Sequence, residues 1–133
     1  MGTTNRPQVI PTLQPARAAS VHGRALDLAV WCADQTTDAS TRAARASWTP
    51  IREAASQVAL AVVEALLLPR RREALGRAER SLEELRERVV SGATAVGVNL
   101  VQVRFLLDEI DAVEGQVAAL RRGPVELSVV SEG

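Results

Sequence analysis

The sequence is poor in the residues that build metal centres, disulfides and catalytic triads. Among its 133 residues it has one cysteine, Cys32, and one histidine, His22. A single cysteine excludes a disulfide within the chain and a zinc site made of several cysteines. No Glu-x-x-His pair occurs, although di-iron helical bundles need such pairs, and no glycine-rich phosphate loop or nucleophile elbow occurs either. We therefore expect a protein that is not an enzyme, with no catalytic residue, no metal and no cofactor.

Aromatic residues are nearly as scarce, and lysine is absent. Only Trp31, Trp48 and Phe105 are aromatic, whereas β-sheet folds rely on aromatic and β-branched residues. Alanine, leucine, arginine and glutamate are abundant instead, and all four are good helix formers. With 47% hydrophobic residues, the chain can bury a core of its own as one domain. The composition therefore predicts an all-α domain.

No charge of either sign prevails, and no apolar run is long. Sixteen arginines balance sixteen acidic residues, so the overall charge gives no reason to expect binding to nucleic acid or to a membrane surface. The longest apolar stretch, residues 58–68, contains Glu64 and is too short to span a bilayer. The first twenty residues hold three prolines and no apolar run, which is unlike a signal peptide. We expect a cytoplasmic protein without membrane contact.

Proline and glycine divide the chain into three segments. Prolines at every fourth position predict a flexible, proline-containing arm over residues 1–24. A four-helix bundle is expected over residues 25–123. A glycine-proline pair then ends the last helix, so that a flexible acidic tail is expected over residues 124–133. The four expected helices cover residues 25–46, 50–68, 69–95 and 99–122.

Two of these helices begin with residues typical of helix starts. Thr49 can cap the second helix and Pro50 suits its first position, while Asn99 can cap the last helix. The connections between consecutive helices are short, which favours an antiparallel four-helix bundle.

Apolar residues recur at helical spacing and predict the core. The second helix is apolar nearly all round from Val58 onward, which in a small domain indicates burial on more than one side and hence self-association. Glu64 interrupts this apolar segment, and we expect it to pair with an arginine of another helix or subunit. The residues expected in the core or at the oligomer contact are Trp31, Val58, Val62, Glu64, Leu82 and Leu85.

The basic residues cluster once, at Arg70-Arg71-Arg72, and Arg77 follows on the same expected helix. Positive charge at the start of a helix opposes the macrodipole. The cluster therefore indicates either a solvated turn or contact with an anionic partner.

Short motifs, in order along the chain, are similar to those of one known family. The matching stretches are Asp27-Leu28-Ala29-Val30-Trp31, Ile51-Arg52-Glu53-Ala54-Ala55 continued by Val58 and Val62-Val63-Glu64, Ala78-x-x-Ser81-Leu82-x-Glu84-Leu85, and Val96-Gly97-Val98. On these motifs the chain resembles the four-helix-bundle proteins encoded in intervening sequences of 23S ribosomal RNA. That family includes the Avd-type accessory proteins of diversity-generating retroelements. The resemblance spans about residues 25–123, with the helices in the same order.

The resemblance implies a homo-oligomer, a pentameric barrel of four-helix bundles. It also implies a non-catalytic accessory role, in which the barrel binds a retroelement reverse transcriptase and its RNA or DNA. This chain is neutral, whereas the retroelement branch is strongly basic, so a protein partner is favoured over nucleic acid. Contacts with the partner or nucleic acid are then expected at Arg52, Arg70, Arg71, Arg72 and Arg77.

Two other interpretations remain open. The neutral charge and the apolar second helix also fit a structural protein–protein interaction scaffold with no nucleic-acid role. A buried enzyme site around Glu64 is the third interpretation. In that case loss of Glu64 would abolish an activity without lowering stability, whereas a structural Glu64 predicts lost assembly.

Overall fold

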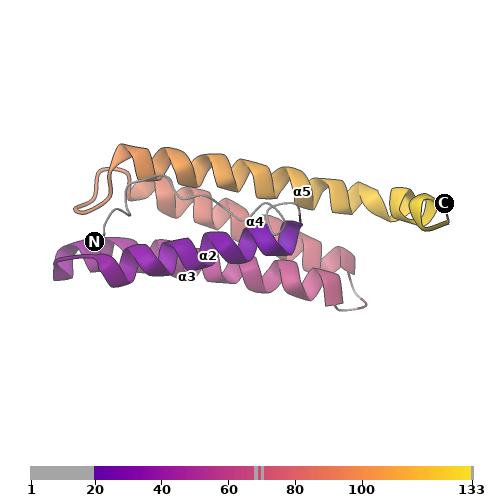
Figure 1. The fold of residues 1–133 in the computed structure, drawn as a ribbon, viewed down its shortest axis with the longest axis horizontal. Helices are drawn as coiled ribbons and strands as arrows, with labels where there is room; N and C mark the ends of the chain where they lie inside the picture. The colour runs from indigo at the N-terminus through magenta and orange to yellow at the C-terminus, as the bar shows by residue number, and fades with distance from the viewer. Residues whose placement is uncertain (1–19, 68, 70, 133) are drawn as a thin grey trace, which may run out of the picture.

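The computed structural model describes residues 20–67, 69 and 71–132, and the side chains of these residues up to Arg122. This part of the chain forms α-helices and no strands, and the helices lie side by side in a bundle (Figure 1). The all-α, four-helix architecture predicted from the sequence is confirmed. The helices are α2 (Val21–Asp38), α3 (Arg42–Leu67), α4 (Arg71–Ser91) and α5 (Leu100–Glu132).

Consecutive helices run antiparallel, as polar contacts between them show. Glu64 near the end of α3 pairs with Arg77 near the start of α4, and Glu79 near the start of α4 pairs with Arg121 of α5. Helix α5 also lies beside α2, since Gln102 donates a hydrogen bond to Gln35. Each helix thus has two neighbours, with α2 between α3 and α5 and α4 between the same two helices.

Side-chain caps fix the starts of α2 and α5. The Ser20 hydroxyl accepts a hydrogen bond from the Gly23 amide, 3.1 Å away, at the start of α2. Before α5, Asn99 Oδ1 accepts from the Gln102 amide at 2.9 Å, while Gln102 Oε1 accepts from the Asn99 amide at 2.8 Å. These reciprocal bonds form a capping box, which confirms the cap predicted at Asn99.

The second helix begins earlier than the sequence predicted, and the first ends earlier. The first helix ends at Asp38 instead of residue 46, because the backbone at Ala39 is extended. Helix α3 then starts at Arg42, where Thr41 Oγ1 accepts from an amide of the first turn at 3.0 Å. Pro50 therefore lies inside α3 and does not open it.

A physical reason for this difference lies in the residues around Pro50. The Thr49 hydroxyl donates to the Arg45 carbonyl at 2.8 Å, so it bonds to the preceding turn and does not cap a new helix. A proline inside a helix removes one backbone hydrogen bond. Burial of Trp48 and Ile51, each 1% exposed, on the same helical stretch offsets this cost.

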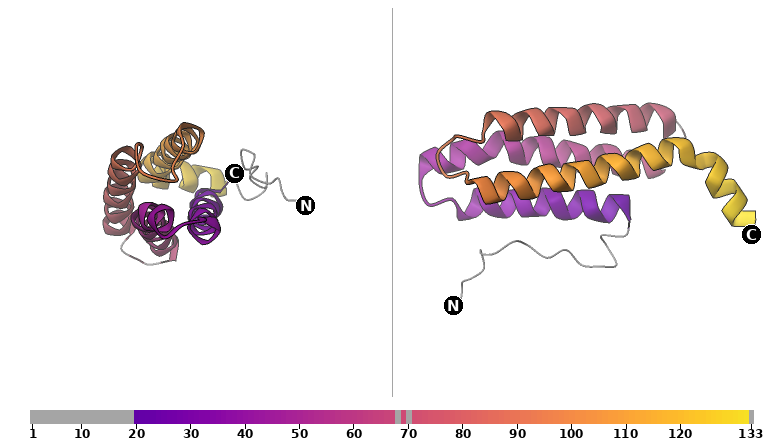
Figure 2. Two further views of the ribbon diagram at one scale, coloured as in Figure 1. Left: turned by 90° about the vertical axis from the view of Figure 1, so that its left-hand side faces the viewer. Right: turned by 90° about the horizontal axis from the view of Figure 1, so that it is seen from above.

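The outer ends of the helices also differ from the predicted ones. Residues 21–24 belong to the first turn of α2 and not to the arm, while residues 1–19 of the expected arm lie outside the described residues. Helix α4 ends at Ser91, not at residue 95. Helix α5 continues through the glycine-proline pair to Glu132, beyond the predicted helix end at residue 122. Its last part bends and extends past the end of the bundle (Figure 2), as a helix interrupted by proline can.

The core is apolar and runs the length of the bundle. Val58, Val62, Leu82 and Leu85, all predicted as core or oligomer residues, are at most 1% exposed in the single chain. Fully buried partners come from the other two helices, for example Leu28, Leu106 and Ile110. None of the helices in the described part has a stretch that is both long and apolar enough to cross a membrane.

The three aromatic side chains meet at one end of the core. Trp31 is half-buried, and its ring centroid lies 5.8 Å from that of Trp48 and 4.7 Å from that of Phe105. Cys32, next in sequence to Trp31, is fully buried, and this burial raises the pKa of its thiol to about 12. Such a thiol stays protonated and unreactive at neutral pH.

Candidate interaction surfaces

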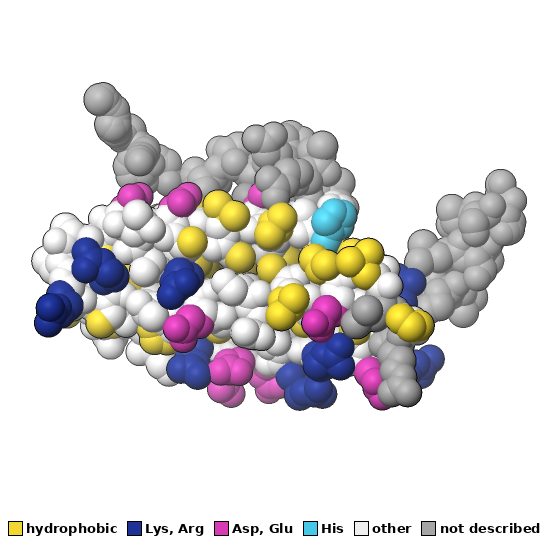
Figure 3. All heavy atoms as spheres, turned by 90° about the horizontal axis from the view of Figure 1, so that it is seen from below, with side chains coloured by type: hydrophobic (Ala, Val, Ile, Leu, Met, Phe, Trp, Pro, Cys, Tyr) yellow, Lys and Arg dark blue, Asp and Glu magenta, His cyan; other side chains and the backbone are white. Residues whose placement is uncertain are grey.

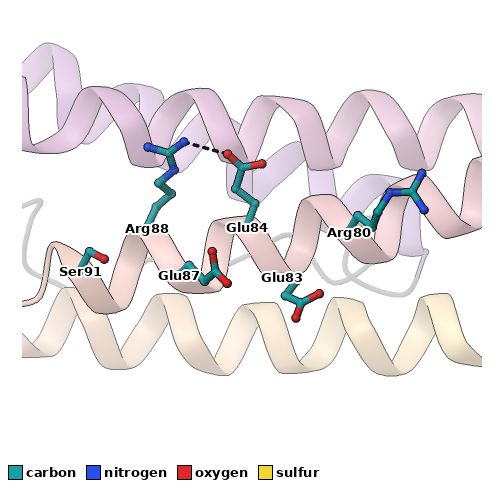
Figure 4. A pocket seen from close by; sticks show the side chains of 6 residues that line it. All are labelled: Arg80, Glu83, Glu84, Glu87, Arg88 and Ser91. Atoms are coloured by element: carbon teal, nitrogen blue, oxygen red, sulfur yellow. Dashed lines mark hydrogen bonds and ion pairs between the residues drawn. The ribbon is translucent and has the colours of Figure 1, made fainter.

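One hollow of the described surface lies on the outer side of a single helix. It has a volume of about 480 Å³ and is lined by Arg80, Glu83, Glu84, Glu87, Arg88 and Ser91, all from α4 (Figure 4). Arg88 donates to Glu84 within the helix at 2.8 Å. Figure 4 shows the other charged side chains pointing in different directions, so the carboxylates do not converge on one point. Within the described residues, no group of three or more His, Cys, Asp or Glu side chains could hold a metal ion.

Basic side chains gather at the end of the bundle where α4 begins and the bundle part of α5 ends. A Cβ atom added at Gly76 would lie 3.7 Å from Arg121 Nη2 and 3.7 Å from Arg80 Nη1, so both guanidinium groups lie near this glycine. Arg121 is held by Glu79 through two bonds of 2.8 and 3.0 Å, and these hydrogen bonds raise its pKa above the ordinary value. We call this region the basic end, and it comprises Arg71, Arg72, Arg77, Arg80, Arg121 and Arg122.

Three arginines predicted from the sequence lie in the basic end. Arg72 is exposed and forms no ion pair among the described residues, whereas exposed Arg77 pairs with Glu64 at 3.3 Å. Arg71 is half-buried, and its Nε atom has no hydrogen-bond partner in the part of the chain that the structure describes. Arg70 lies outside the described residues.

Arg52, the fifth predicted contact, is not in the basic end. It lies on α3 fifteen residues before Leu67, which corresponds to about 22 Å along the helix axis. Its side chain is half-buried, and its Nε atom has no hydrogen-bond partner in the described part of the chain. The structure therefore separates Arg52 from the other candidate contacts.

The sequence analysis missed Arg121 and Arg122 as members of the basic end. The signal was present, because in an antiparallel bundle the end of the last helix lies beside the start of the third. Six arginines and three glutamates (Glu64, Glu73 and Glu79) occupy this end, a local excess of three positive charges in a chain of zero net charge.

Glu64 pairs with an arginine of another helix, as predicted. Its partner is Arg77 of α4, and the Glu64 side chain is 35% exposed. Glu64 is thus accessible to solvent and does not lie in a closed apolar pocket. This geometry supports the structural interpretation of Glu64 over the buried enzyme site.

An apolar surface extends over α2 and α3. Leu26 and Val30 of α2 are 42% and 52% exposed, and Leu60 and Leu67 of α3 are 52% and 74% exposed. Figure 3 shows hydrophobic side chains gathered along this surface, with basic side chains at its left end, along its lower edge and at its right end. We call this surface the α2–α3 face. Helix α3, which the sequence shows as apolar nearly all round from Val58 onward, therefore keeps apolar side chains exposed on its outer side in the single chain.

The contact between α2 and α5 is polar, which the sequence analysis did not predict. Arg24 of α2 lies 3.6 Å from Glu109 of α5, and their side chains are 24% and 16% exposed. Burial raises the pKa of Glu109, and the negative charges of Asp108 and Asp27 act in the same direction, whereas Arg24 opposes the shift. The Glu109 carboxylate is thus only partly compensated at neutral pH.

Comparison of the chain with family models, with curated proteins and with solved structures found no match.

Proposed function

We propose that the chain is a non-catalytic, cytoplasmic adaptor that self-associates into a barrel and serves a reverse transcriptase and its RNA or DNA. The ordered motifs that resemble Avd-type accessory proteins support the choice of partner and the pentameric form. The observation that carries the proposal is the basic end, where positive charge gathers on a chain whose net charge is zero.

The basic end has the chemistry of a phosphate contact. Arg72 and Arg80 are exposed and form no ion pair within the described residues, so their guanidinium groups are available to an anion. Arginine binds phosphate through parallel hydrogen bonds from its planar fork. Three excess charges per chain give weak binding, but several copies in one barrel present several such ends to the same nucleic acid.

The test is to reverse the charge of the basic end and measure RNA binding. The variant Arg72→Glu/Arg80→Glu changes two exposed arginines of the basic end, and Arg88→Glu/Arg104→Glu makes the same change in net charge towards the other end of the bundle. Fluorescence anisotropy with bulk tRNA at low salt is expected to show an affinity about tenfold lower for the first variant and little change for the second. Equal effects of both variants would show only a dependence on net charge and would contradict a contact at the basic end.

The protein partner needs its own experiment. The proposal predicts a reverse-transcriptase gene beside the gene for this chain, and that enzyme, produced with an affinity tag, is expected to retain the chain in a pull-down. The Arg72→Glu/Arg80→Glu variant is expected to be retained less. Failure of the wild-type chain to bind that enzyme would contradict the accessory role.

A scaffold with no nucleic-acid role is the second candidate function. The α2–α3 face favours it, since an apolar surface spanning two helices is typical of protein–protein contact. This candidate predicts self-association without any binding of tRNA.

A further inference from the structure

Helix α2 is the least firmly held of the four described helices. It has 18 residues, whereas α3, α4 and α5 have 26, 21 and 33. Leu28 is its only large apolar side chain that is fully buried. Helix α4 is similar in length, yet the side chains that it buries in the core include Leu75, Leu82, Leu85 and Val89. Because tertiary burial supplies most of the stability of a helix in a bundle, α2 is bound less tightly than α4.

The charges at the two ends of α2 oppose its own dipole. The N-terminus of a helix attracts negative charge, and the C-terminus attracts positive charge. In α2 the first turn carries Arg24 and no acidic residue, while the last turn carries Asp38 and no basic residue. Both charges therefore lower the stability of the helix. The Thr36 hydroxyl also donates to the Cys32 carbonyl at 2.9 Å, and such a bond within a helix is slightly destabilising.

The contact of α2 with α5 is polar and imperfectly paired. Arg24 Nε lies 3.6 Å from Glu109 Oε1, which is too far for a hydrogen bond. Both atoms are buried, and neither has a hydrogen-bond partner among the residues that the structure describes. Buried charged atoms that make no hydrogen bond cost free energy. This contact therefore does little to hold α2 against the bundle.

The connection to α3 allows α2 to leave the bundle alone. Only residues 39–41 join the two helices, and the backbone at Ala39 is extended. The other three helices share a core of their own, with Ile51, Leu82 and Leu106 fully buried. A helix as short as α2 is only marginally stable in water without its neighbours, so it loses its helical structure when it leaves.

We propose that α2 is a latch, which opens by local unfolding while α3, α4 and α5 stay packed together. Opening uncovers one end of the core, because Trp31 of α2 packs against Trp48 of α3 and Phe105 of α5. The open chain then presents an apolar surface that the closed chain lacks. A partner that binds this surface holds the latch open. The inference concerns the single chain and rests on no part of the proposed function.

The chain contains its own reporter of this opening. Cys32 is the only cysteine in the sequence, and its side chain is fully buried on α2. The buried thiol does not react with iodoacetamide, whereas local unfolding of α2 gives it the ordinary reactivity of a cysteine. Ala78 is the matched position, because it is fully buried on α4. The variant Cys32→Ala/Ala78→Cys thus moves the single thiol from α2 to α4.

The experiment measures the rate of alkylation of dilute full-length chain by mass spectrometry, with circular dichroism to verify helix content. Without urea, we expect Cys32 of the wild type to be alkylated at least about 100-fold faster than the thiol at position 78 of the variant. Low urea should accelerate alkylation much more at position 78 than at Cys32, because global unfolding exposes more surface than local opening does. Equal rates with equal urea dependence would overturn the proposal, since α2 would then open only when the whole chain unfolds.

Hydrogen exchange of the wild-type chain tests the latch without any substitution. We expect the amides of α2 around Leu28 to exchange at least about 100-fold faster than those of α4 around Leu82. Mass spectrometry of peptic fragments measures both rates in one sample. Equal protection of the two helices would contradict a separate opening of α2.

A change of charge at the end of α2 tests whether the helix unfolds when the latch opens. Asp38→Arg places a positive charge in the last turn and is expected to slow alkylation of Cys32 about two- to fivefold. Glu83→Arg makes the same change in net charge on α4, where Glu83 is exposed, and is expected to leave the rate unchanged. If Asp38→Arg does not slow alkylation more than Glu83→Arg does, local unfolding of α2 is not the opening step and the proposal fails.

Discussion

The indole Nε1 of Trp48 donates a hydrogen bond to the backbone carbonyl of Gly97, 3.0 Å away and 49 residues later in the chain. This bond ties α3 to the loop between α4 and α5. Gly97 has a φ of +84°, and a Cβ atom added there would lie 2.5 Å from the Cβ atom of Ala44. The backbone and the packing therefore both require glycine at this position.

Replacing Gly97 by alanine is expected to destabilise the fold. The positive φ and the clash with Ala44 together predict a loss of about 2–3 kcal/mol in the free energy of unfolding. Urea denaturation followed by circular dichroism measures this loss. Gly115 is the matched control, because it is exposed within α5 and a Cβ atom there meets nothing within 4 Å. Gly115→Ala should stabilise the chain by about 0.5–1 kcal/mol, and equal effects at the two glycines would contradict the account.

Replacing Trp48 by phenylalanine is expected to lower the free energy of unfolding by about 1–3 kcal/mol. The variant keeps most of the apolar surface but loses the hydrogen bond to Gly97 and part of the contact with Trp31. Trp31→Phe provides the comparison, since the Trp31 ring is only half-buried. If Trp31→Phe lowers the free energy of unfolding more than Trp48→Phe does, contacts within the aromatic cluster contribute more to stability than the hydrogen bond to the loop.

The contact between α2 and α5 predicts a pH dependence of stability. Because the folded state raises the pKa of Glu109, the folded chain binds this proton more tightly than the unfolded chain does. The stability contributed by this group is thus present below the ordinary value of 4.5 and is lost as the pH rises through the raised pKa. Glu109→Gln should therefore be at least as stable as the wild type at pH 7 and gain no advantage at pH 4.

Urea denaturation at both pH values measures this difference. Glu83→Gln is the control, because Glu83 is exposed on α4 and has no ion pair in the described part of the chain. A Glu109→Gln variant that is less stable than the wild type at pH 7 would mean that attraction to Arg24 outweighs the cost of burial.

Arg86 joins α4 to α5 through two carboxylates, and its loss should weaken that contact. Its Nη2 atom lies 2.6 Å from Asp111 and 2.6 Å from Glu114. The Arg86 side chain is 34% exposed, so after allowance for solvent screening we expect Arg86→Met to lower the free energy of unfolding by about 1 kcal/mol. Arg88→Met removes a pair within α4 only and is expected to show no measurable change. Raising the salt concentration should reduce the difference in the free energy of unfolding between wild type and Arg86→Met. If that difference does not depend on salt, the loss comes from packing of the Arg86 side chain and not from its charge.

The helices were predictable because their apolar residues keep helical spacing through Val58, Leu82 and Leu85, and burial depends mostly on that spacing. The start of α3 was not predictable from Thr49 and Pro50. Local residue types favoured a new helix there, but burial of Trp48 in the tertiary structure decided otherwise.

Surface relationships were harder to predict than the core. The partner of Glu64 was foreseen as an arginine of another helix, since a carboxylate in an apolar segment needs a positive charge nearby. The approach of Arg121 to Glu79 and of Arg24 to Glu109 depends on the rotation of α5 about its axis. That rotation depends on how the whole bundle packs, and no local pattern encodes it.

The most direct test of the central claim is light scattering of the purified chain at low salt, with and without bulk tRNA. If the chain is a self-associating adaptor with a basic end, we expect a multimer whose mass increases when tRNA is added. A monomer whose mass does not change with tRNA would contradict both the self-association and the nucleic-acid role.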